Sequence, residues 1–423
     1  MMILNGLPEG WRDIRLGECL RAVNGGTSVI SEERVAFDGE LRILKTSAVS
    51  KGVYLPSENK ALTESAATTL SVSPLAGCIL FNRKNTPELV GTSAYIENDE
   101  PKTFLPDLLW QLHVCAEDRF HARWLSYVLS AQRTQSEIRK RANGTSESMM
   151  NITKPSLCSI HIPCPPFIEQ KKIANLLIGW DRAIELTERL IAEKRLCRRG
   201  LMQQLLTGKR RLPGFRKTQK NRSTKWGDYP VEWGYPRIGE VAKHVSITNK
   251  EGDSLPVLSC TKHQGLVDSL EYFGKQIFSK DLSTYKVVRR GQFAYATNHL
   301  EEGSIGYQNI HDAALISPMY TVFEAGENID DRFLFLLLKT ELYRHIFQVN
   351  TSASVDRRGS LRWPEFSHLH VPLPSLDEQR AIVKVIKVAD RELDLLRAKA
   401  NALREQKKGL MQQLLTGKKR VKV

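Results

Sequence analysis

The most regular pattern of apolar side chains in this sequence follows two segments of about 40 residues, which end near residues 208 and 417. Positions spaced alternately four and three residues apart are mostly apolar in both segments, and the flanking positions are charged. This period of 3.5 residues is typical of helices that pack along a coiled-coil seam. One such helix cannot bury its stripe alone, so we expect the two to bury each other. The predicted seam residues are Ile173, Leu177, Trp180, Ile184, Ile191, Leu201, Leu205, Ile382, Ile386, Leu393, Leu396, Leu403, Leu410 and Leu414.

The decapeptide GLMQQLLTGK ends both segments and is identical in its two copies, residues 200–209 and 409–418. Each segment also begins after a P-x-P sequence with a Glu-Gln pair, Glu169-Gln170 or Glu378-Gln379, at a constant shift of 209 residues. Proline disfavours α geometry just upstream of itself, and glycine is a common residue directly after a helix. The repeat therefore predicts one structural unit that is used twice.

A region with the composition of a globular domain precedes each long segment. The two regions open alike, with LPEGWRDIRLGE at 7–18 and YPVEWGYPRIGE at 229–240, but their interiors have diverged. Short β-rich runs between glycine-bearing loops predict strands at 42–49, 77–81, 291–296 and 318–323. Apolar periodicity predicts helices at 123–136 and 332–346. We therefore predict an α+β (mixed α/β) fold in five parts, residues 1–166, 167–208, 209–228, 229–375 and 376–423.

A net charge of +15 favours a polyanionic partner, although a basic solvated surface without a partner explains it equally well. Eight Lys and Arg residues and no acid lie in 208–226, which we interpret as a solvated linker first and a phosphate-contacting strap second. The seven cysteines are scattered without a C-x-x-C pair, which argues against a zinc site or a disulfide framework. Without an apolar run of membrane-spanning length or a signal-peptide pattern, we expect a cytoplasmic protein.

The sequence contains none of the common catalytic motifs. A phosphate-binding P-loop, a G-x-G-x-x-G turn, an H-E-x-x-H pair and a G-x-S-x-G elbow are all absent. We therefore expect no catalysis by this chain, no catalytic residue and no metal site.

Two diverged domains on a repeated frame suggest recognition of two different half-sites at a fixed spacing, and the basic charge makes double-stranded DNA the expected ligand. Base edges are read by Arg, Lys, Asn, Gln and hydroxyl side chains on loops, for which a solvated surface loop is the alternative interpretation. Candidates in the first domain are Lys45, Thr46, Ser47, Asn82, Arg83, Lys84, Asn85, Arg139, Lys140, Arg141, Asn143 and Thr145. Candidates in the second are Thr261, Lys262, His263, Gln264, Asn298, His299, Asn350, Ser352, Arg357 and Arg358.

The two GLMQQLLTGK copies, the proline and Glu-Gln helix starts and the LPEGW opening together resemble specificity subunits of Type I restriction–modification systems. The stretch NRKNTPELVG at 82–91 also resembles one that is common in that family's target recognition domains. The resemblance spans essentially the whole chain. It implies two target recognition domains, joined by two helices that pack as an antiparallel coiled coil and related by a pseudo-two-fold internal repeat.

The resemblance further implies a non-catalytic subunit that reads a bipartite, asymmetric DNA target. Two methyltransferase subunits, which modify adenine N6, and restriction subunits are the implied partners. S-adenosylmethionine, ATP and Mg would be used by those partners, with no cofactor in this chain. The second domain departs from the pattern, because TNHLEEGSIG at 297–306 lacks the arginine of the first domain's loop. A coiled-coil adaptor whose globular ends bind proteins remains the alternative.

Overall fold

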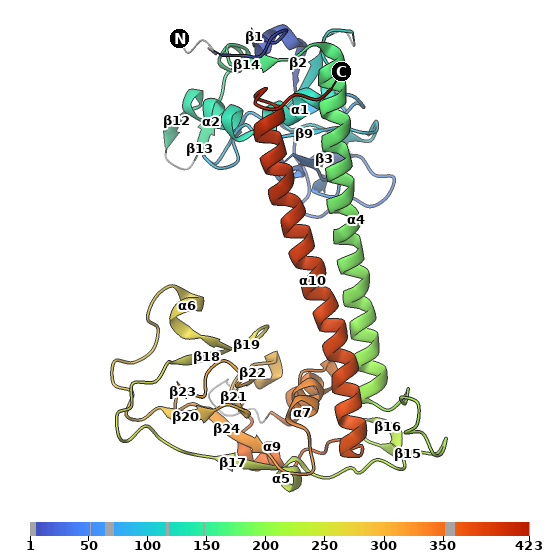
Figure 1. Cartoon of the computed structure of the whole chain (residues 1–423), viewed down its shortest axis with the longest axis vertical. Helices are drawn as coiled ribbons and strands as arrows, with labels where there is room; N and C mark the ends of the chain where they lie inside the picture. The colour runs from blue at the N-terminus through green and yellow to red at the C-terminus, as the bar shows by residue number, and fades with distance from the viewer. Residues whose placement is uncertain are drawn as a thin grey trace. The chain divides into compact units, whose positions relative to one another are not determined.

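The computed structural model describes residues 6–50, 52–63, 72–115, 118–146, 149–351 and 360–422 (Figure 1). The chain divides into two compact units. Unit 1 comprises Met1–Glu188 and Ala398–Val423, and unit 2 comprises Arg189–Arg397. Each unit therefore contains a globular part, one portion of the long helix α4 (Phe167–Leu206) and one portion of the long helix α10 (Leu376–Leu414).

The central sheets of the two units have the same antiparallel strand order. In unit 1 the order is β2 (Leu20–Gly25), β11 (Leu109–Val114), β7 (Ile79–Asn82) and β9 (Ser93–Tyr95). In unit 2 it is β17 (Ala242–Val245), β24 (Tyr320–Ala325), β21 (Gln292–Ala296) and β22 (Ile305–Tyr307). The strands predicted at 77–81, 291–296 and 318–323 are confirmed to within two residues. The strand predicted at 42–49 is wrong in its second half, where the chain forms a 3₁₀ turn at Thr46–Ala48.

Shorter elements surround these sheets. Those of unit 1 are β1 (Arg12–Arg15), β3 (Arg42–Leu44), β4 (Val49–Ser50), β5 (Val53–Tyr54), β6 (Asn59–Ala61), β8 (Lys84–Asn85), β10 (Thr103–Phe104), β12 (Asn143–Ser146), β13 (Met149–Asn151), α3 (Lys154–Cys158) and β14 (His161–Cys164). Those of unit 2 are β15 (Asn221–Thr224), β16 (Gly227–Pro230), α5 (Ile238–Val241), β18 (Leu258–Thr261), β19 (Gly265–Asp268), α6 (Ser269–Phe273), β20 (Lys286–Arg289), β23 (Ala313–Ile316) and α9 (Trp363–Ser367).

Two helices follow the sheet in each unit, where the sequence predicts one. The helix predicted at 123–136 is divided into α1 (Ala122–Ser130) and α2 (Gln132–Arg141), because Ala131 has extended backbone geometry with ψ of 139°. The helix predicted at 332–346 is divided into α7 (Asp331–Leu338) and α8 (Glu341–Asn350). Thr340 starts α8 by accepting a hydrogen bond from the amide of Tyr343. Apolar periodicity continues across both breaks, so it did not reveal them.

The first of these helices carries the main core of each unit. Trp124 of α1 is fully buried in a cluster with Phe81 of the sheet and Ile173 of α4. Phe333 of α7 is equally buried, with Phe293 of the sheet and Ile382 of α10. Since the long helices contribute to both cores, they are part of the folded units.

The prediction of two long helices packed together is confirmed. Every predicted seam residue is buried or half-buried. In unit 1 charged pairs join the helices between Glu188 and Arg404 and between Asp181 and Lys407. In unit 2 charged pairs join Arg198 to Asp390 and Lys194 to Glu392. In both units later residues of α4 meet earlier residues of α10, so the helices are antiparallel. None of the described helices is long and apolar enough to cross a membrane.

A buried carboxylate fixes the start of each long helix. In unit 1, Oε2 of Glu169 accepts hydrogen bonds from Nε1 of Trp11 at 3.1 Å and from Nη2 of Arg420 at 2.9 Å. In unit 2, Oε2 of Glu378 accepts them from Nε1 of Trp233 at 3.0 Å and from Nη2 of Arg211 at 2.7 Å. The two clusters are equivalent in the repeat. A buried charge is costly unless it is paired and hydrogen-bonded, and both glutamates meet that condition.

The glutamine that follows each glutamate ties the helix to the globular part. Oε1 of Gln170 accepts from the amide of His121 at 2.9 Å, just before α1. Oε1 of Gln379 accepts from the amide of Asp330 at 2.7 Å, just before α7. The Glu-Gln pair noted in the sequence therefore contacts two different segments of the same unit.

The glycine of each Thr-Gly-Lys end has a positive φ, 70° at Gly208 and 75° at Gly417. A Cβ at Gly208 would lie 2.5 Å from Cδ of Pro230, and one at Gly417 would lie 2.6 Å from Cγ of Pro8. Both positions therefore require glycine, because the backbone has a positive φ and because it packs closely against the segment that carries Trp233 or Trp11.

We expect Gly208→Ala to destabilise unit 2, by about 1–2 kcal/mol from the left-handed backbone and by about 1–3 kcal/mol more from overpacking. Gly200→Ala is the matched control in the same decapeptide. Its Cβ would meet no atom within 4 Å inside a helix, so it should stabilise by roughly 0.5–1 kcal/mol. Thermal unfolding of the two variants measures the difference. Equal effects would contradict the assigned role of Gly208.

Candidate nucleic-acid interface

The structure gathers most of the first domain's candidate residues at the end of strand β7. Asn82 is the last residue of that strand and is fully buried. Its Nδ2 donates to the carbonyl oxygens of Thr46 and Val49, both at 3.2 Å, and to Oγ1 of Thr92 at 2.7 Å. The Lys45–Ser47 segment is thereby held beside the strand end. Asn82 acts inside the protein and positions this segment.

The residues that follow Asn82 form a second small sheet with another candidate segment. Strand β8, which is Lys84 and Asn85, pairs with β13, and β13 pairs with β12. Asn143 is exposed at the start of β12. Thr145 lies on the same strand. Two candidate segments about 60 residues apart in the sequence are thus brought into one sheet.

Arg83 lies against an aromatic ring, that of Trp110, which is not among the candidates from the sequence. Its Cζ is 5.9 Å from the ring centroid of buried Trp110, and Nζ of Lys154 is 6.0 Å from the same centroid. Nε of Arg83 is buried without a hydrogen-bond partner among the described residues. Lys154 is exposed at the first position of α3 and donates to the carbonyl of Val23 at 2.7 Å. Two cations on one indole make this the most concentrated basic site near the strand end.

The cations at the end of α2 are already engaged with neighbouring groups. Nη2 of Arg139 donates to the carbonyl of Glu88 at 3.0 Å, and Nζ of Lys140 donates to Glu137 at 3.0 Å. Arg141 lies 3.9 Å from the same carboxylate. Exposed pairs of this kind contribute little, so an external phosphate can compete for Lys140, whose side chain is 69% exposed.

The equivalent site of unit 2 has different chemistry. The carbonyl of Arg83 accepts from the amide of Ile152, and the carbonyl of Thr297 accepts from the amide of Leu361, the repeat partner of Ile152. Thr297 therefore occupies the place of Arg83. The place of Lys154 is taken by Trp363, which stacks on His244 with ring centroids 5.5 Å apart. Asn298 and His299 follow, half-buried and exposed respectively.

The other candidate segment of unit 2 forms the tight turn between β18 and β19. Lys262, His263 and Gln264 are exposed on this turn, and Oγ1 of Thr261 accepts from the amide of Gln264 at 3.1 Å. Nζ of Lys339 donates to the carbonyls of Lys262 at 3.1 Å and Gly303 at 2.9 Å, which joins this turn to the loop after His299. Burial lowers the pKa of the Lys339 ammonium. The two candidate loops of unit 2 are therefore neighbours.

The remaining candidates of unit 2 are Asn350, Ser352, Arg357 and Arg358. Nδ2 of Asn350 donates to the carbonyl of Ile346 at 2.7 Å, where it supports the last turn of α8. Ser352, Arg357 and Arg358 lie outside the described residues.

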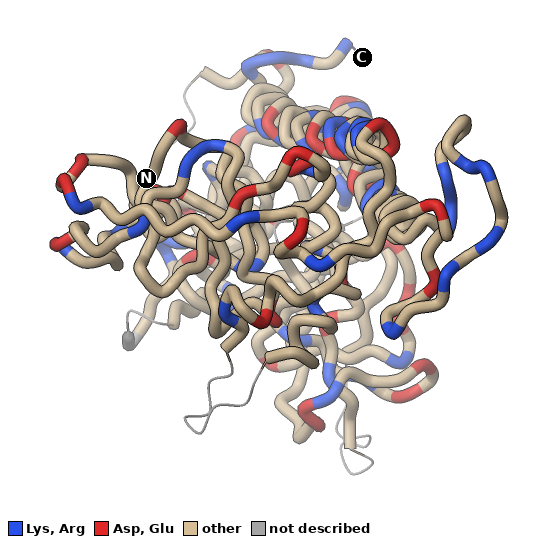
Figure 2. Tube along the Cα trace, turned by 90° about the horizontal axis from the view of Figure 1, so that it is seen from below, with Lys and Arg blue, Asp and Glu red and all other residues tan. Residues whose placement is uncertain are grey.

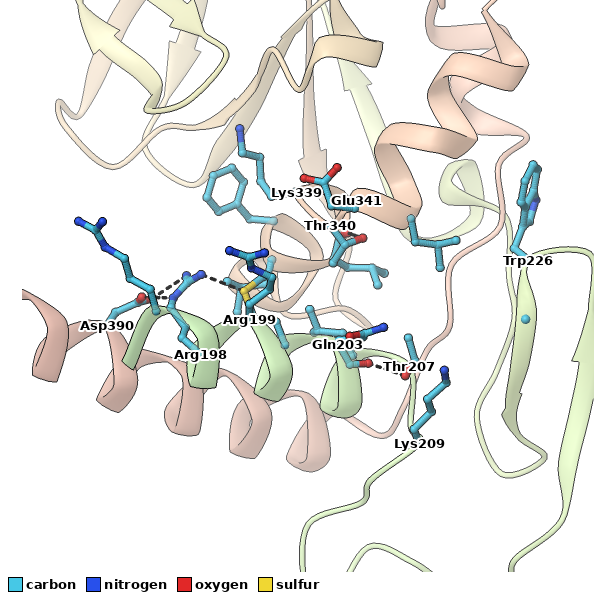
Figure 3. A pocket seen from close by; sticks show the side chains of 18 of the residues that line it. Arg198, Arg199, Gln203, Thr207, Lys209, Trp226, Lys339, Thr340, Glu341 and Asp390 are labelled. Atoms are coloured by element: carbon cyan, nitrogen blue, oxygen red, sulfur yellow. Dashed lines mark hydrogen bonds and ion pairs between the residues drawn. The ribbon is translucent and has the colours of Figure 1, made fainter. Parts of the chain in front are cut away.

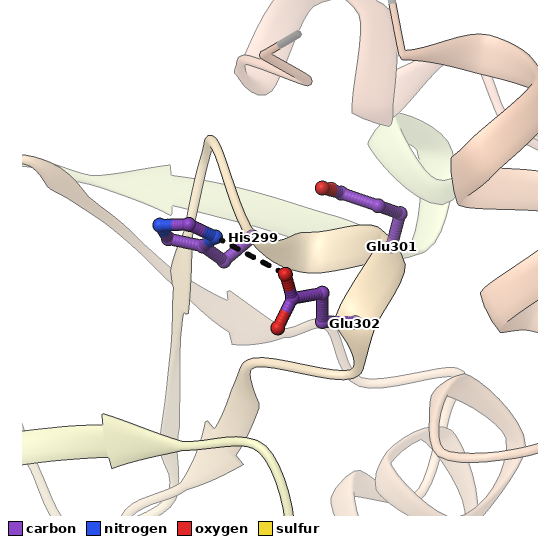
Figure 4. Close-up of side chains that lie close together, drawn as sticks. All are labelled: His299, Glu301 and Glu302. Atoms are coloured by element: carbon purple, nitrogen blue, oxygen red, sulfur yellow. Dashed lines mark ion pairs between the residues drawn. The ribbon is translucent and has the colours of Figure 1, made fainter. Parts of the chain in front are cut away.

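His299, Glu301 and Glu302 bring three metal-ligating side chains within 4.8 Å of one another (Figure 4). Nδ1 of His299 lies 3.6 Å from Oε1 of Glu302, and Nζ of Lys262 lies 3.7 Å from its Oε2. An ammonium at this distance already balances the carboxylate charge. These contacts account for His299 and Glu302, and the two glutamates give this loop an acidic character that the residues directly after Arg83 do not have.

The basic segment at 208–226 is a folded part of unit 2 and makes several contacts within it. Nη1 of Arg211 pairs with Glu232 at 2.8 Å in addition to its bonds with Glu378, and its side chain is only 6% exposed. Strands β15 and β16 form a hairpin, and Trp226 packs edge-on against His345 at 6.0 Å. Viewed from below, Lys and Arg lie on many segments with Asp and Glu between them (Figure 2). Net charge alone therefore does not locate the interface.

Comparison with known proteins shows which family this chain resembles. The profile of the Type I restriction modification DNA specificity domain matches residues 8–193 and 230–405, one match in each half of the chain. The chain is 22% identical to the Type I restriction enzyme MjaVIII specificity subunit of Methanocaldococcus jannaschii, covering 98% of this chain and 94% of that protein. It is 30% identical over 172 residues to the EcoEI specificity subunit of Escherichia coli, covering 40% of this chain and 29% of that protein.

Solved structures share the fold. The type I restriction–modification S subunit from M. genitalium has a TM-score of 0.54 at 16% identity, with 98% of both chains covered. A chain from a structure on assembly and conformational transition of a type I restriction–modification system has a TM-score of 0.58 at 17% identity, with 97% of this chain and 99% of that chain covered. At these identities the likeness establishes the architecture alone.

We expect Asn82→Ala to lower the free energy of unfolding by about 1–3 kcal/mol, because buried carbonyls lose a hydrogen-bond donor. Asn85→Ala is the matched control, since Oδ1 of Asn85 accepts from the adjacent amide of Thr86 at 2.9 Å. Chemical denaturation followed by tryptophan fluorescence measures both variants. An Asn82→Ala protein as stable as the control would show that Asn82 does not position the Lys45–Ser47 segment.

Proposed function

The chain belongs to the Type I restriction–modification DNA specificity family, and from this premise we propose that units 1 and 2 read the two halves of an asymmetric DNA target. Proteins of this family are the non-catalytic specificity subunits of their complexes. The use of S-adenosylmethionine and ATP belongs to the partner subunits. We propose duplex DNA as the ligand and the cytoplasm as the place where it is bound.

The observation that carries the proposal is the different chemistry at equivalent strand ends. Arg83 and Lys154 flank Trp110 in unit 1, whereas Thr297 and Trp363 occupy the same positions in unit 2. Arginine is suited to bidentate contacts with guanine, and threonine is suited to single hydrogen bonds or to the thymine methyl. One frame that presents two different sets of side chains fits a target whose halves differ.

The surroundings of the candidate residues divide them into proposed base contacts and proposed phosphate contacts. In unit 1 we propose Arg83, Lys84 and Asn85 as base contacts and Lys140 and Lys154 as phosphate contacts. In unit 2 we propose the exposed Lys262–Gln264 turn with Asn298 and His299 as the reading segment. Phosphate contacts set the register of a protein on DNA, and base-edge contacts carry the specificity.

Two exposed leucines on the long helices support the proposal that two methyltransferase subunits dock there. Leu186 of α4 and Leu395 of α10 occupy equivalent positions in the repeat. They are exposed by 54% and 56%. Leu186 lies in unit 1 and Leu395 in unit 2, and they are an exposed pair that the repeat keeps at the same position. We propose that each marks the docking position of one methyltransferase copy, and that restriction subunits join the resulting complex.

The alternative is a coiled-coil adaptor that binds only proteins. Co-expression with a cognate adenine methyltransferase, followed by mapping of methylated adenines in the DNA, distinguishes the two. A two-part asymmetric motif supports DNA reading, and unmodified DNA from an intact complex would favour the adaptor. DNA affinity should also fall steeply with salt concentration, because displaced counterions are released.

We expect Arg83→Ala to weaken recognition of one half-site by about 1–3 kcal/mol, the range for a bidentate arginine–guanine contact. The complex with methyltransferase should be titrated with targets altered in either half. Thr297→Ala, at the equivalent position of unit 2, is the control and should affect the other half. An equal loss at both halves would show that Arg83 supplies only general charge.

We expect Leu186→Asp to reduce the bound methyltransferase from two copies to one, because a charged carboxylate in an apolar contact is costly. Leu395→Asp should do the same, and the double variant should bind none. Native mass spectrometry counts the copies. Met319→Asp, at another side chain that is 64% exposed, is the control. Two copies on both single variants would refute the assignment.

A further inference from the structure

Unit 2 contains an open cavity of about 990 Å³ (Figure 3). Its walls come from the last turns of α4, the facing part of α10, the junction of α7 and α8, the β15–β16 hairpin and the turn after β18. The volume is within the range of about 300–1,000 Å³ that is usual for small-molecule sites. The turn proposed for reading DNA contributes only His263 and Gln264 to the lining, and the other lining residues lie outside the proposed reading segments.

The cavity is lined by more cations than the protein neutralises. Arg198 is paired with Asp390, and Lys339 is bonded to backbone carbonyls. Arg195, Arg199 and Lys209 also line it, and the structure gives none of these three an ion-pair partner among the described residues. Figure 3 shows Arg199 extending from α4 towards the segment that carries Lys339 and Thr340. Three carboxylates also line the cavity: Asp390 and Glu341 are already paired, the latter with Arg344 at 2.8 Å, and Asp228 is exposed to solvent on the hairpin.

The repeat provides an internal comparison. In unit 1, Arg404 of α10 pairs with Glu188 of α4. Their equivalents in unit 2 are Arg195 and Arg397, so a pair of opposite charges is replaced by two arginines, and both line the cavity. Arg397 turns instead to Asp394 on its own helix, at 2.9 Å. Like charges at a cross-helix position are unfavourable unless an anion lies between them.

A second replacement opens the space. In unit 1 the hydroxyl of Tyr127 donates to Asp181 at 2.7 Å beside Lys407. The equivalent of Tyr127 in unit 2 is Leu336, which lines the cavity and has no hydroxyl. Unit 2 thus keeps an arginine at the place of Arg404, but it has no carboxylate at the place of Glu188 and no hydroxyl at the place of Tyr127.

The opposite wall is aromatic. Trp226 of the hairpin and Phe335 of α7 line the cavity, and both are half-buried. Nζ of Lys225 lies 4.8 Å from the ring centroid of Trp226. Planar heteroaromatic rings stack on such side chains, while guanidinium groups bind phosphate oxygens in pairs.

We propose that this cavity binds a phosphate-bearing ligand of nucleotide size, with Arg195 and Arg199 as the principal phosphate contacts and Trp226 as the stacking surface. The phosphate comes either from a free nucleotide or from the backbone of bound DNA. Arg195, Arg199 and Trp226 lie outside the reading segments proposed for both units, so loss of this site and loss of half-site reading are distinguishable.

The test uses the purified full chain and isothermal titration with ATP, pyrophosphate, adenosine and a short non-target duplex. We expect ATP and pyrophosphate to bind and adenosine to bind much more weakly. Arg199→Gln should reduce the affinity at least about tenfold, as expected for a charged hydrogen-bonding group. Arg182→Gln, at an exposed arginine of α4 in unit 1, is the control and should leave the affinity unchanged.

Arg397→Glu is the sharper variant, because it restores the charge pattern of unit 1. It should raise the thermal unfolding temperature of the free chain at low salt and abolish stabilisation by ATP. If only the duplex binds, and these variants weaken it, the phosphate source is the DNA backbone. If neither nucleotide, pyrophosphate nor duplex binding responds to Arg199→Gln or Arg397→Glu, the inference is overturned.

Discussion

One interaction, a buried glutamate at the start of each long helix, accounts for most of what the two halves share. Glu169 is fully buried, so its charge must be met by donors from distant parts of the chain. Trp11 comes from the opening segment, and Arg420 follows the end of the other helix. Gly417 lets the chain pass closely over Pro8 beside this cluster. The motifs that repeat in the sequence are therefore the parts of one contact set, and its geometry leaves little freedom to change any of them.

The globular parts follow a different constraint. Their central sheets keep the same strand order, because α1 or α7 must pack on the sheet and on the long helix at once. The residues that follow the strand ends are less tightly bound by this packing, and they differ between the two units. Arg83 over Trp110 and Thr297 in its place illustrate the result. A constant frame with variable strand ends is what a subunit needs to join the same partners while reading a two-part sequence.

The ion pairs between the two long helices also divide into pairs that occur in both units and pairs that occur in one. The pair of Arg198 with Asp390 is repeated as Lys407 with Asp181, so this cross-helix contact belongs to the frame. The pair of Arg404 with Glu188 is not repeated, and two arginines remain beside a cavity in unit 2. The internal repeat thus separates structural charges, which occur twice, from charges that serve one unit.

The sequence by itself determined the repeat, the two long helices and the positions of their seam, because helical periodicity and identical motifs are local properties. It also placed three strands of the central sheets, β7, β21 and β24, to within two residues. It could not show that Ala131 divides a helix, since apolar spacing continues across the break. Nor could it separate Asn82 from Arg83, which are neighbours in the chain. Only tertiary structure decided that Asn82 is buried and holds a turn while Arg83 lies against Trp110, because burial and partners depend on residues far away in the sequence.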